Sequence, residues 1–142
     1  MSDSIEINTE GLARMAGEGI HAGFPSPAQD YMTGCIDLNK ELVRHPEATF
    51  YGRVSGDSMK DAGINDGDIA VIDRSLTAVQ GDVIVAFVDG EFTIKYLDLS
   101  HRDEGYILLH PANPEYKDIR IEGNQAFEVW GVVVWTIKCW RR

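Results

Sequence analysis

The feature that most constrains the fold is a series of short segments rich in Val, Ile, Phe, Tyr and Thr that begins at residue 49. Gly, Asp and Asn separate these segments, as they separate strands joined by turns. Asp89-Gly90 lies between two of the segments and is a strong signal for a two-residue hairpin. Short strands at this spacing predict a mainly β fold, a compact and mostly antiparallel body with a long final strand. The predicted strands are residues 49–55, 69–73, 82–88, 91–97, 105–110, 118–121 and 126–137.

One short helix is predicted before this β-rich part. Asp37 can cap its first turn, two leucines share one face, and Pro46 stops it. Residues 1–22 are short of large apolar side chains and are interrupted by glycines, so we expect a flexible N-terminal arm there. The predicted organisation is therefore an arm at 1–22, an extended linker with the short helix at 23–45, and a β-rich domain at 46–142.

Length and charge limit the classes of function. A chain of 142 residues with 44% hydrophobic residues fits one globular domain with a real core. Its formal net charge of -10 argues against sequence-independent DNA binding, because such binding needs Lys and Arg to replace phosphate counterions. We therefore expect no direct sequence-specific DNA binding either, and any link to nucleic acid should run through a partner.

Neither the cysteines nor the histidines indicate a metal centre. Cys35 and Cys139 lie far apart and match neither a disulfide framework nor a zinc spacing, which favours a reducing compartment. The acidic, glycine-rich residues 61–68 fail the EF-hand pattern, and the four histidines show no ligand spacing. No metal or cofactor is predicted. Without a long apolar run or a signal peptide, the expected location is cytoplasmic, with no membrane association.

The candidate catalytic residues are Ser58 and Lys95. Ser58 lies in Val54-Ser55-Gly56-Asp57-Ser58-Met59, a turn of small residues after an apolar strand. A serine hydroxyl becomes a nucleophile only when a base takes its proton. Lys95 lies in a strand-like run among Phe92, Ile94 and Leu97, where burial would disfavour the ammonium form. A neutral lysine beside a serine is a known variant of the serine, histidine and acid triad.

Each of these residues also has an ordinary structural interpretation. Ser-Gly-Asp-Ser is common turn chemistry, and a strand lysine often lays its stem on apolar neighbours with the ammonium in water. The segment His21-Ala22-Gly23-Phe24-Pro25-Ser26-Pro27 likewise has two interpretations, a cleavage site and a linker. Small residues around the Ala22-Gly23 bond would let the peptide approach a catalytic hydroxyl, but the same residues suit a proline-rich linker. The residues alone leave these alternatives open.

Five blocks of sequence follow one another in a specific order. They are Phe24-Pro25-Ser26-Pro27-Ala28, Ile36-Asp37-Leu38-Asn39, Ser55-Gly56-Asp57-Ser58-Met59, Gly63-Ile64-Asn65-Asp66-Gly67-Asp68 and Asp89-Gly90-Glu91-Phe92-Thr93-Ile94-Lys95. Together they resemble the UmuD-type proteins, which belong with the LexA repressors among the self-cleaving serine peptidases. The resemblance covers nearly the whole chain from about Gly23 onward and implies the fold of their C-terminal domains. It also implies that Ser58 is the nucleophile, Lys95 the base, Ala22-Gly23 the bond that is cut, and the backbone N–H groups of Asp57 and Ser58 the oxyanion site.

The resemblance also implies a biological role. Self-cleavage would be slow alone, promoted by RecA filaments on single-stranded DNA, and would give a trimmed homodimer. That dimer would join a Y-family DNA polymerase subunit of UmuC type for error-prone translesion synthesis in the SOS response. Two alternatives stay open: a non-catalytic polymerase accessory module, and a LexA-like repressor. The roughly 45 residues before the β-rich part show no helix-turn-helix pattern, which weakens the repressor hypothesis.

Overall fold

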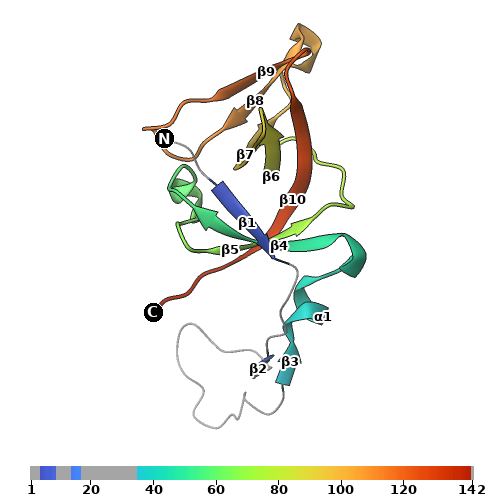
Figure 1. The fold of residues 1–142 in the computed structure, drawn as a ribbon, viewed down its shortest axis with the longest axis vertical. Helices are drawn as coiled ribbons and strands as arrows, with labels where there is room; N and C mark the ends of the chain where they lie inside the picture. The colour runs from blue at the N-terminus through green and yellow to red at the C-terminus, as the bar shows by residue number, and fades with distance from the viewer. Residues whose placement is uncertain (1–3, 9–13, 17–34, 142) are drawn as a thin grey trace.

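The protein is built on one large antiparallel sheet. This computed structural model describes residues 4–8, 14–16 and 35–141, and those residues form an eight-stranded sheet, a separate two-stranded sheet and one short helix (Figure 1). Every strand pairing is antiparallel, which confirms the predicted mainly β class. In spatial order the large sheet contains β1 (Ser4–Asn8), β4 (Thr49–Ser55), β5 (Ile69–Asp73), β10 (Phe127–Ile137), β6 (Val83–Val88), β7 (Glu91–Asp98), β8 (Tyr106–His110) and β9 (Ile119–Glu122).

All seven predicted strands are present, each within one residue of its predicted ends. The hairpin between β6 and β7 also forms at the predicted dipeptide. Asp89 has φ 49° and Gly90 has φ 88°, the left-handed backbone that a two-residue turn of type I′ requires at both positions. The local sequence therefore fixes the register of β6 against β7, in which Ile84 lies opposite Lys95.

The predicted helix is α1 (Leu38–Leu42), and it begins as expected. The Asp37 carboxylate accepts a hydrogen bond from Asn39 N at 3.0 Å and so caps the first turn. None of the described helices has the length and apolar character needed to cross a bilayer. Single turns of 3₁₀ helix occur at Pro46–Ala48, Lys60–Ala62 and Arg102–Glu104.

Three further strands were not predicted, and two of them belong to the N-terminal arm. β1 pairs with β4 along its whole length, from Ser4 opposite Ser55 to Asn8 opposite Tyr51, and it also lies beside β7. β2 (Arg14–Ala16) pairs with β3 (Cys35–Asp37) in the small sheet below α1 (Figure 1). The remaining positions of the arm, including the predicted cleavage bond Ala22-Gly23, lie outside the described residues.

β10 joins two halves of the large sheet. Its first part, from Phe127 to Val132, pairs with β6, and its second part, from Val132 to Ile137, pairs with β5. Register shifts beside Gly131 and between Val133 and Trp135 bend the strand so that it can serve both neighbours. Consequently β1, β4 and β5 form one half, β6 to β9 form the other, and β10 is the junction, visible in Figure 1 as the long red strand.

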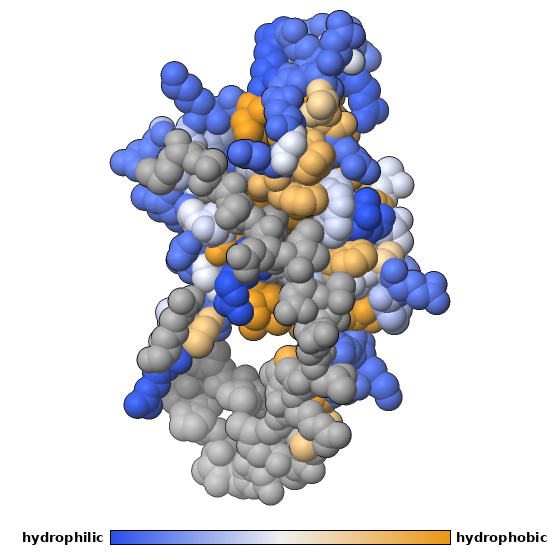
Figure 2. Space-filling model, viewed as in Figure 1, coloured by the Kyte–Doolittle hydropathy of each residue, from blue (hydrophilic) through white to orange (hydrophobic). Residues whose placement is uncertain are grey.

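The core has two parts, one on each face of β6 and β7. Successive residues of a strand point to opposite faces, so Val85 and Ile94 enter one cluster while Ile84 and Leu97 enter the other. Figure 2 shows apolar side chains gathered over the middle of the body and hydrophilic ones at its upper end. The buried members of the first cluster are Val54, Met59, Ile64, Ala70, Ile72, Val85 and Ile94, and those of the second are Ile84, Ala86, Leu97, Leu109, Ile121 and Val132.

Candidate active site

Ser58 lies in a tight turn that follows β4. Gly56 adopts φ 96°, a backbone conformation that only glycine enters without strain, and its N–H donates to Asp66 Oδ1 at 2.9 Å. Met59 then enters the first core cluster and is 1% exposed, so the residue after Ser58 is fixed by packing. Ser58 itself is 1% exposed. The turn therefore holds the serine inside the protein rather than on its surface.

Lys95 is buried on the neighbouring half of the sheet. It is 4% exposed, and its Nζ lies 2.9 Å from Ser58 Oγ, so the two predicted residues are in hydrogen-bond contact although they are 37 positions apart in sequence. Lys95 Nζ also donates to Thr93 Oγ1 at 2.8 Å and to the carbonyl oxygen of Ile94 at 3.1 Å. The sequence predicted that Ser58 and Lys95 lie beside each other, and they do. The sequence analysis did not identify Thr93, although residues two positions apart on a strand share a face and Thr93 lies two positions before Lys95.

The apolar surroundings of Lys95 differ in one respect from the prediction. The sequence suggested Phe92, Ile94 and Leu97 as its neighbours, but strand alternation places Phe92 and Ile94 on the opposite face of β7. Leu97 shares the face of Lys95, and the residue opposite Lys95 on β6 is Ile84, which is fully buried. An apolar environment is therefore present, and cross-strand neighbours supply part of it.

Lys95 Nζ donates to three oxygen atoms, those of the Ser58 hydroxyl, the Thr93 hydroxyl and the Ile94 carbonyl. An ammonium has three N–H donors and can make all three bonds, whereas a neutral amine has two N–H groups and one lone pair. In its neutral form the amine can accept the proton of the Ser58 hydroxyl over the same short distance. The geometry therefore allows a proton to pass between the two groups.

A second segment holds the Ser58 turn in place. Ala112 N donates to the Ser58 carbonyl oxygen at 2.8 Å, and Asn113 Nδ2 donates to the Asp57 carbonyl oxygen at 2.9 Å. The hydroxyl of Tyr116 donates to Asp57 Oδ1 at 2.7 Å. The sequence analysis missed this segment because Asn113 is followed by a proline, and that pair reads as an ordinary turn.

His110, just before this segment, contacts two carboxylates. His110 Nδ1 lies 2.8 Å from Asp118 Oδ1, and its Nε2 lies 2.7 Å from Asp98 Oδ2. Hydrogen bonds to Asp118 and Asp98 raise the pKa of His110, and partial burial opposes them. Hydrogen bonds from Ser100 and His110 hold the pKa of Asp98 well below its ordinary value. His110 therefore links β8 to the end of β7 and to the residue before β9.

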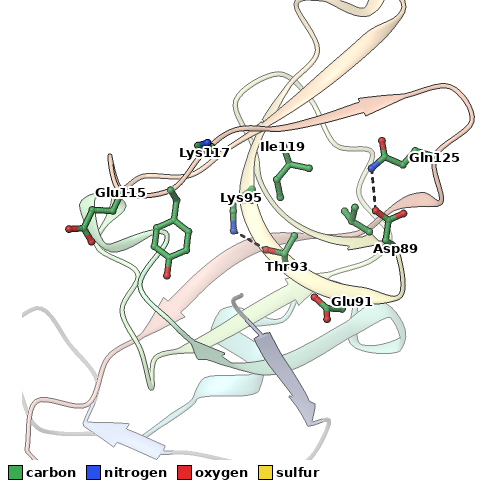
Figure 3. Close-up of a pocket in the computed structure, with 10 residues that line it drawn as sticks. Asp89, Glu91, Thr93, Lys95, Glu115, Lys117, Ile119 and Gln125 are labelled. Carbon is green, nitrogen blue, oxygen red and sulfur yellow. Dashed lines mark hydrogen bonds between the residues drawn. The ribbon is translucent and has the colours of Figure 1, made fainter. Parts of the chain in front are cut away.

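A hollow of about 750 Å³ lies beside Lys95. Figure 3 shows Lys95 and Thr93 side by side on β7, with Glu115, Lys117 and Ile119 on the segment opposite. β8 pairs with β7 only at Tyr96–Asp98, so the part of β7 that borders the hollow is not paired with β8. The volume is in the range of protein ligand sites and admits a short stretch of extended peptide.

Three further features of the described residues concern the site. Within the described part of the chain, no three side chains of His, Cys, Asp or Glu are arranged to hold a metal ion. Cys35 and Cys139 are both exposed thiols. The backbone of Asp57 and Ser58 lies in the turn as predicted, but its role as an oxyanion site stays a prediction.

A serine and a lysine in contact within a small β domain define a class, the hydrolases that use a Ser-Lys pair. The chain matches the Peptidase S24-like family over residues 15–134. It is 48% identical over 115 residues to Protein MucA of Salmonella typhimurium, covering 80% of this chain and 76% of that protein. It is 47% identical over 108 residues to Protein SamA of the same species, covering 76% and 74%.

The chain therefore belongs to the Peptidase S24-like family of autoproteolytic Ser-Lys peptidases, and it is a UmuD-like, self-cleaving protein of SOS mutagenesis. It is also similar to the LexA repressor of Alteromonas mediterranea, with 36% identity over 120 residues. That match covers 84% of this chain but only 56% of the repressor. Membership in this family favours the peptidase hypothesis over the non-catalytic alternative.

Proposed function

We propose that this protein cuts its own Ala22-Gly23 bond, with Ser58 as the nucleophile and Lys95 as the base. The observation that carries the proposal is the 2.9 Å contact between Lys95 Nζ and Ser58 Oγ, both of them buried. A buried serine gains reactivity only from a partner that can accept its proton, and Lys95 is in reach of it.

Acylation begins when neutral Lys95 takes the proton of the Ser58 hydroxyl as Oγ attacks the carbonyl carbon of Ala22. Backbone N–H groups of Asp57 and Ser58 stabilise the negative oxygen of the tetrahedral intermediate. Lys95 then gives its proton to the nitrogen of Gly23, the peptide bond breaks, and Ala22 remains bound to Ser58 as an ester. The leaving fragment carries a new amino terminus at Gly23.

Deacylation uses the same base. Lys95 takes a proton from a water molecule that attacks the ester carbonyl, and the proton returns to Ser58 Oγ as the ester breaks. The products are a carboxyl group on Ala22 and a regenerated serine. The sum of both steps is hydrolysis of one peptide bond, and it needs no metal or cofactor.

The substrate segment is proposed to lie in the hollow beside β7. Glu91 and Thr93 line that hollow together with Lys95, and this stretch of β7 is not paired with β8. An extended peptide can therefore hydrogen-bond to the strand edge, which is the usual way in which a sheet binds a peptide. The small side chain of Ala22 and the absence of one on Gly23 allow close approach to Ser58.

The wider role is proposed from family membership. Self-cleavage is stimulated by a RecA filament on single-stranded DNA, and it removes the arm at residues 1–22. The trimmed homodimer then acts in the cytoplasm as a subunit of an error-prone, Y-family DNA polymerase of UmuC type. The relatives MucA, SamA and ImpA support this role, since each is 43% to 48% identical to the chain.

The test is self-cleavage of the purified full chain at alkaline pH, where amines in general give up their proton more readily. We expect a fragment that begins at Gly23, identified by N-terminal sequencing or mass spectrometry. Ser58→Ala and Lys95→Ala should each abolish it and leave the circular-dichroism spectrum unchanged. Ser55→Ala and Lys60→Ala are matched controls, because both side chains are exposed and lie close to the turn.

A fragment that appears undiminished in Ser58→Ala would show that another group attacks the bond. A new amino terminus away from Gly23 would refute the assigned bond while leaving the Ser58 and Lys95 roles intact. RecA stimulation is tested by adding RecA, single-stranded DNA and a nucleotide triphosphate. An unchanged cleavage rate would contradict that part of the proposal alone.

A further inference from the structure

Asn113 is the most deeply buried polar residue of the segment that holds the Ser58 turn. It is 4% exposed, and both ends of its amide make hydrogen bonds. Nδ2 donates to the Asp57 carbonyl oxygen at 2.9 Å, and Oδ1 accepts from Glu115 N at 3.0 Å. The second bond orders the local turn around Asn113, whereas the first reaches across 56 positions of sequence to the residue before Ser58.

The first bond fixes more than the Asp57 carbonyl. Because a peptide bond is planar and trans, the Asp57 carbonyl and the Ser58 N–H belong to one rigid unit and point in opposite directions. A donor that holds the carbonyl therefore also sets the direction of the N–H. The Asp57 carbonyl accepts a second bond from Lys60 N at 3.2 Å, and the next carbonyl, that of Ser58, accepts from Ala112 N at 2.8 Å.

We propose that Asn113 is a positioning residue for the oxyanion site: its amide holds the Asp57 carbonyl so that the Ser58 N–H points at the oxygen of the attacked carbonyl. This inference rests on the proposed self-cleavage and extends it to a residue outside the pair that exchanges the proton. Oxyanion donors act through their preorganised direction, so a donor that can rotate stabilises the transition state less.

The sharpest variant is Asn113→Asp. An aspartate keeps an oxygen that can accept from Glu115 N, but it has no N–H to offer the Asp57 carbonyl. Asn113→Ser, which is smaller and uncharged, is the second variant if the introduced carboxylate perturbs folding. The matched control is Thr49→Val, which also removes one buried donor from a backbone carbonyl, since Thr49 Oγ1 donates to His45 O at 2.8 Å.

The experiment measures the self-cleavage rate of the full chain across a range of pH, together with the melting temperature. Complete loss of an oxyanion donor costs about 10²- to 10³-fold in rate, so a donor that is misdirected but still present should cost about 10- to 100-fold. We expect both Asn113 variants to slow cleavage by that factor, and we expect Asn113→Ser, which adds no charge, to leave the midpoint of the pH profile unchanged. Thr49→Val should lower the melting temperature about as much as the Asn113 variants do, because it also loses one buried hydrogen bond. It should leave the cleavage rate as in the wild type.

The pH profile separates positioning from a merely structural role. A turn that had loosened as a whole would carry Ser58 away from Lys95 and admit water to the amine, which would move the midpoint. A shifted midpoint in Asn113→Ser, a rate within twofold of the wild type, or a loss of rate matched by Thr49→Val would each overturn the inference. Ser58→Ala in the same assay tests the proposed function itself, because its cleavage must vanish whatever Asn113 does.

Discussion

A single methyl group added at Gly131 should destabilise the protein and slow its self-cleavage. Gly131 is buried in β10, where the strand bends between its two partners. A Cβ at this position would lie 2.5 Å from Ile72 Cγ2, 3.3 Å from Arg74 Cγ and 3.5 Å from the Asp73 carbonyl oxygen. Carbon atoms in favourable contact are about 3.5–4.0 Å apart, so the methyl group overlaps Ile72 by about 1 Å.

The size of the effect follows from what surrounds Ile72. This side chain is fully buried in the first core cluster, and because protein interiors are close-packed it can move only by displacing its neighbours. Overpacking of a filled core costs about 1–3 kcal/mol in the free energy of unfolding. For a chain of this length about 4 °C of melting temperature corresponds to 1 kcal/mol, so Gly131→Ala should lower it by about 4–12 °C.

The assay is thermal unfolding followed by circular dichroism, with Gly123→Ala as the matched control. A Cβ at Gly123 would have no atom within 4 Å, so that variant should melt within about 0.5 kcal/mol of the wild type or slightly above it. Because Ile72 packs in one cluster with Met59 and Ile94, a shifted Ile72 should also slow cleavage at temperatures where the variant is still folded. Equal melting temperatures for the two variants would refute the packing argument.

Two other changes give independent predictions. Thr93→Val should slow self-cleavage by up to about tenfold, because an isosteric side chain removes one hydrogen bond of about 1 kcal/mol from the Lys95 amine; a full rate in the cleavage assay would show that this contact is dispensable. The free energy of unfolding should fall as pH rises above 6.5, because the raised pKa of His110 keeps it charged in the folded state up to a higher pH than in the unfolded chain. Urea titrations at about pH 6 and about pH 8.5 should show this fall in the wild type but a smaller one in His110→Gln, and equal falls would contradict it.

The strands of the body were predictable because their signals are local. Alternation of side chains and the Asp89-Gly90 turn operate within a few residues, and the seven strands follow them. β1 was not predicted, although Ile5 and Ile7 alternate with polar residues, because residues 1–22 are short of large apolar side chains and are interrupted by glycines, which indicated a flexible arm. Its partner β4 begins about 40 positions later, and only the folded sheet brings the two together.

The contact between Ser58 and Lys95 was predictable, but the residues around it were not. Ser58 and Lys95 were identified by residue type and by resemblance to a family, and the structure places their side chains 2.9 Å apart, while their catalytic roles stay a prediction. Thr93 and Asn113 were missed because a threonine in a strand and an asparagine before a proline are common in any β protein. Thr93 lies two positions before Lys95 on the same strand, so its contact could have been read from the spacing. The bond from Asn113 to the Asp57 carbonyl crosses 56 positions, and no local pattern encodes it.

The position of the pair on the sheet explains why β10 should matter for catalysis. Ser58 follows β4, in the half formed by β1, β4 and β5, whereas Lys95 is on β7, in the half formed by β6 to β9. Among the described residues, strand pairing joins these halves through β10, and the 2.9 Å contact between the two side chains spans the same junction. β1 also lies beside β7, and Ala112 and Asn113 bond to the Ser58 turn from the other half. Interiors are close-packed and pass displacements on, so we expect a change in the bend of β10 to alter that contact. The self-cleavage rate is therefore a sensitive measure of how well the two halves are joined.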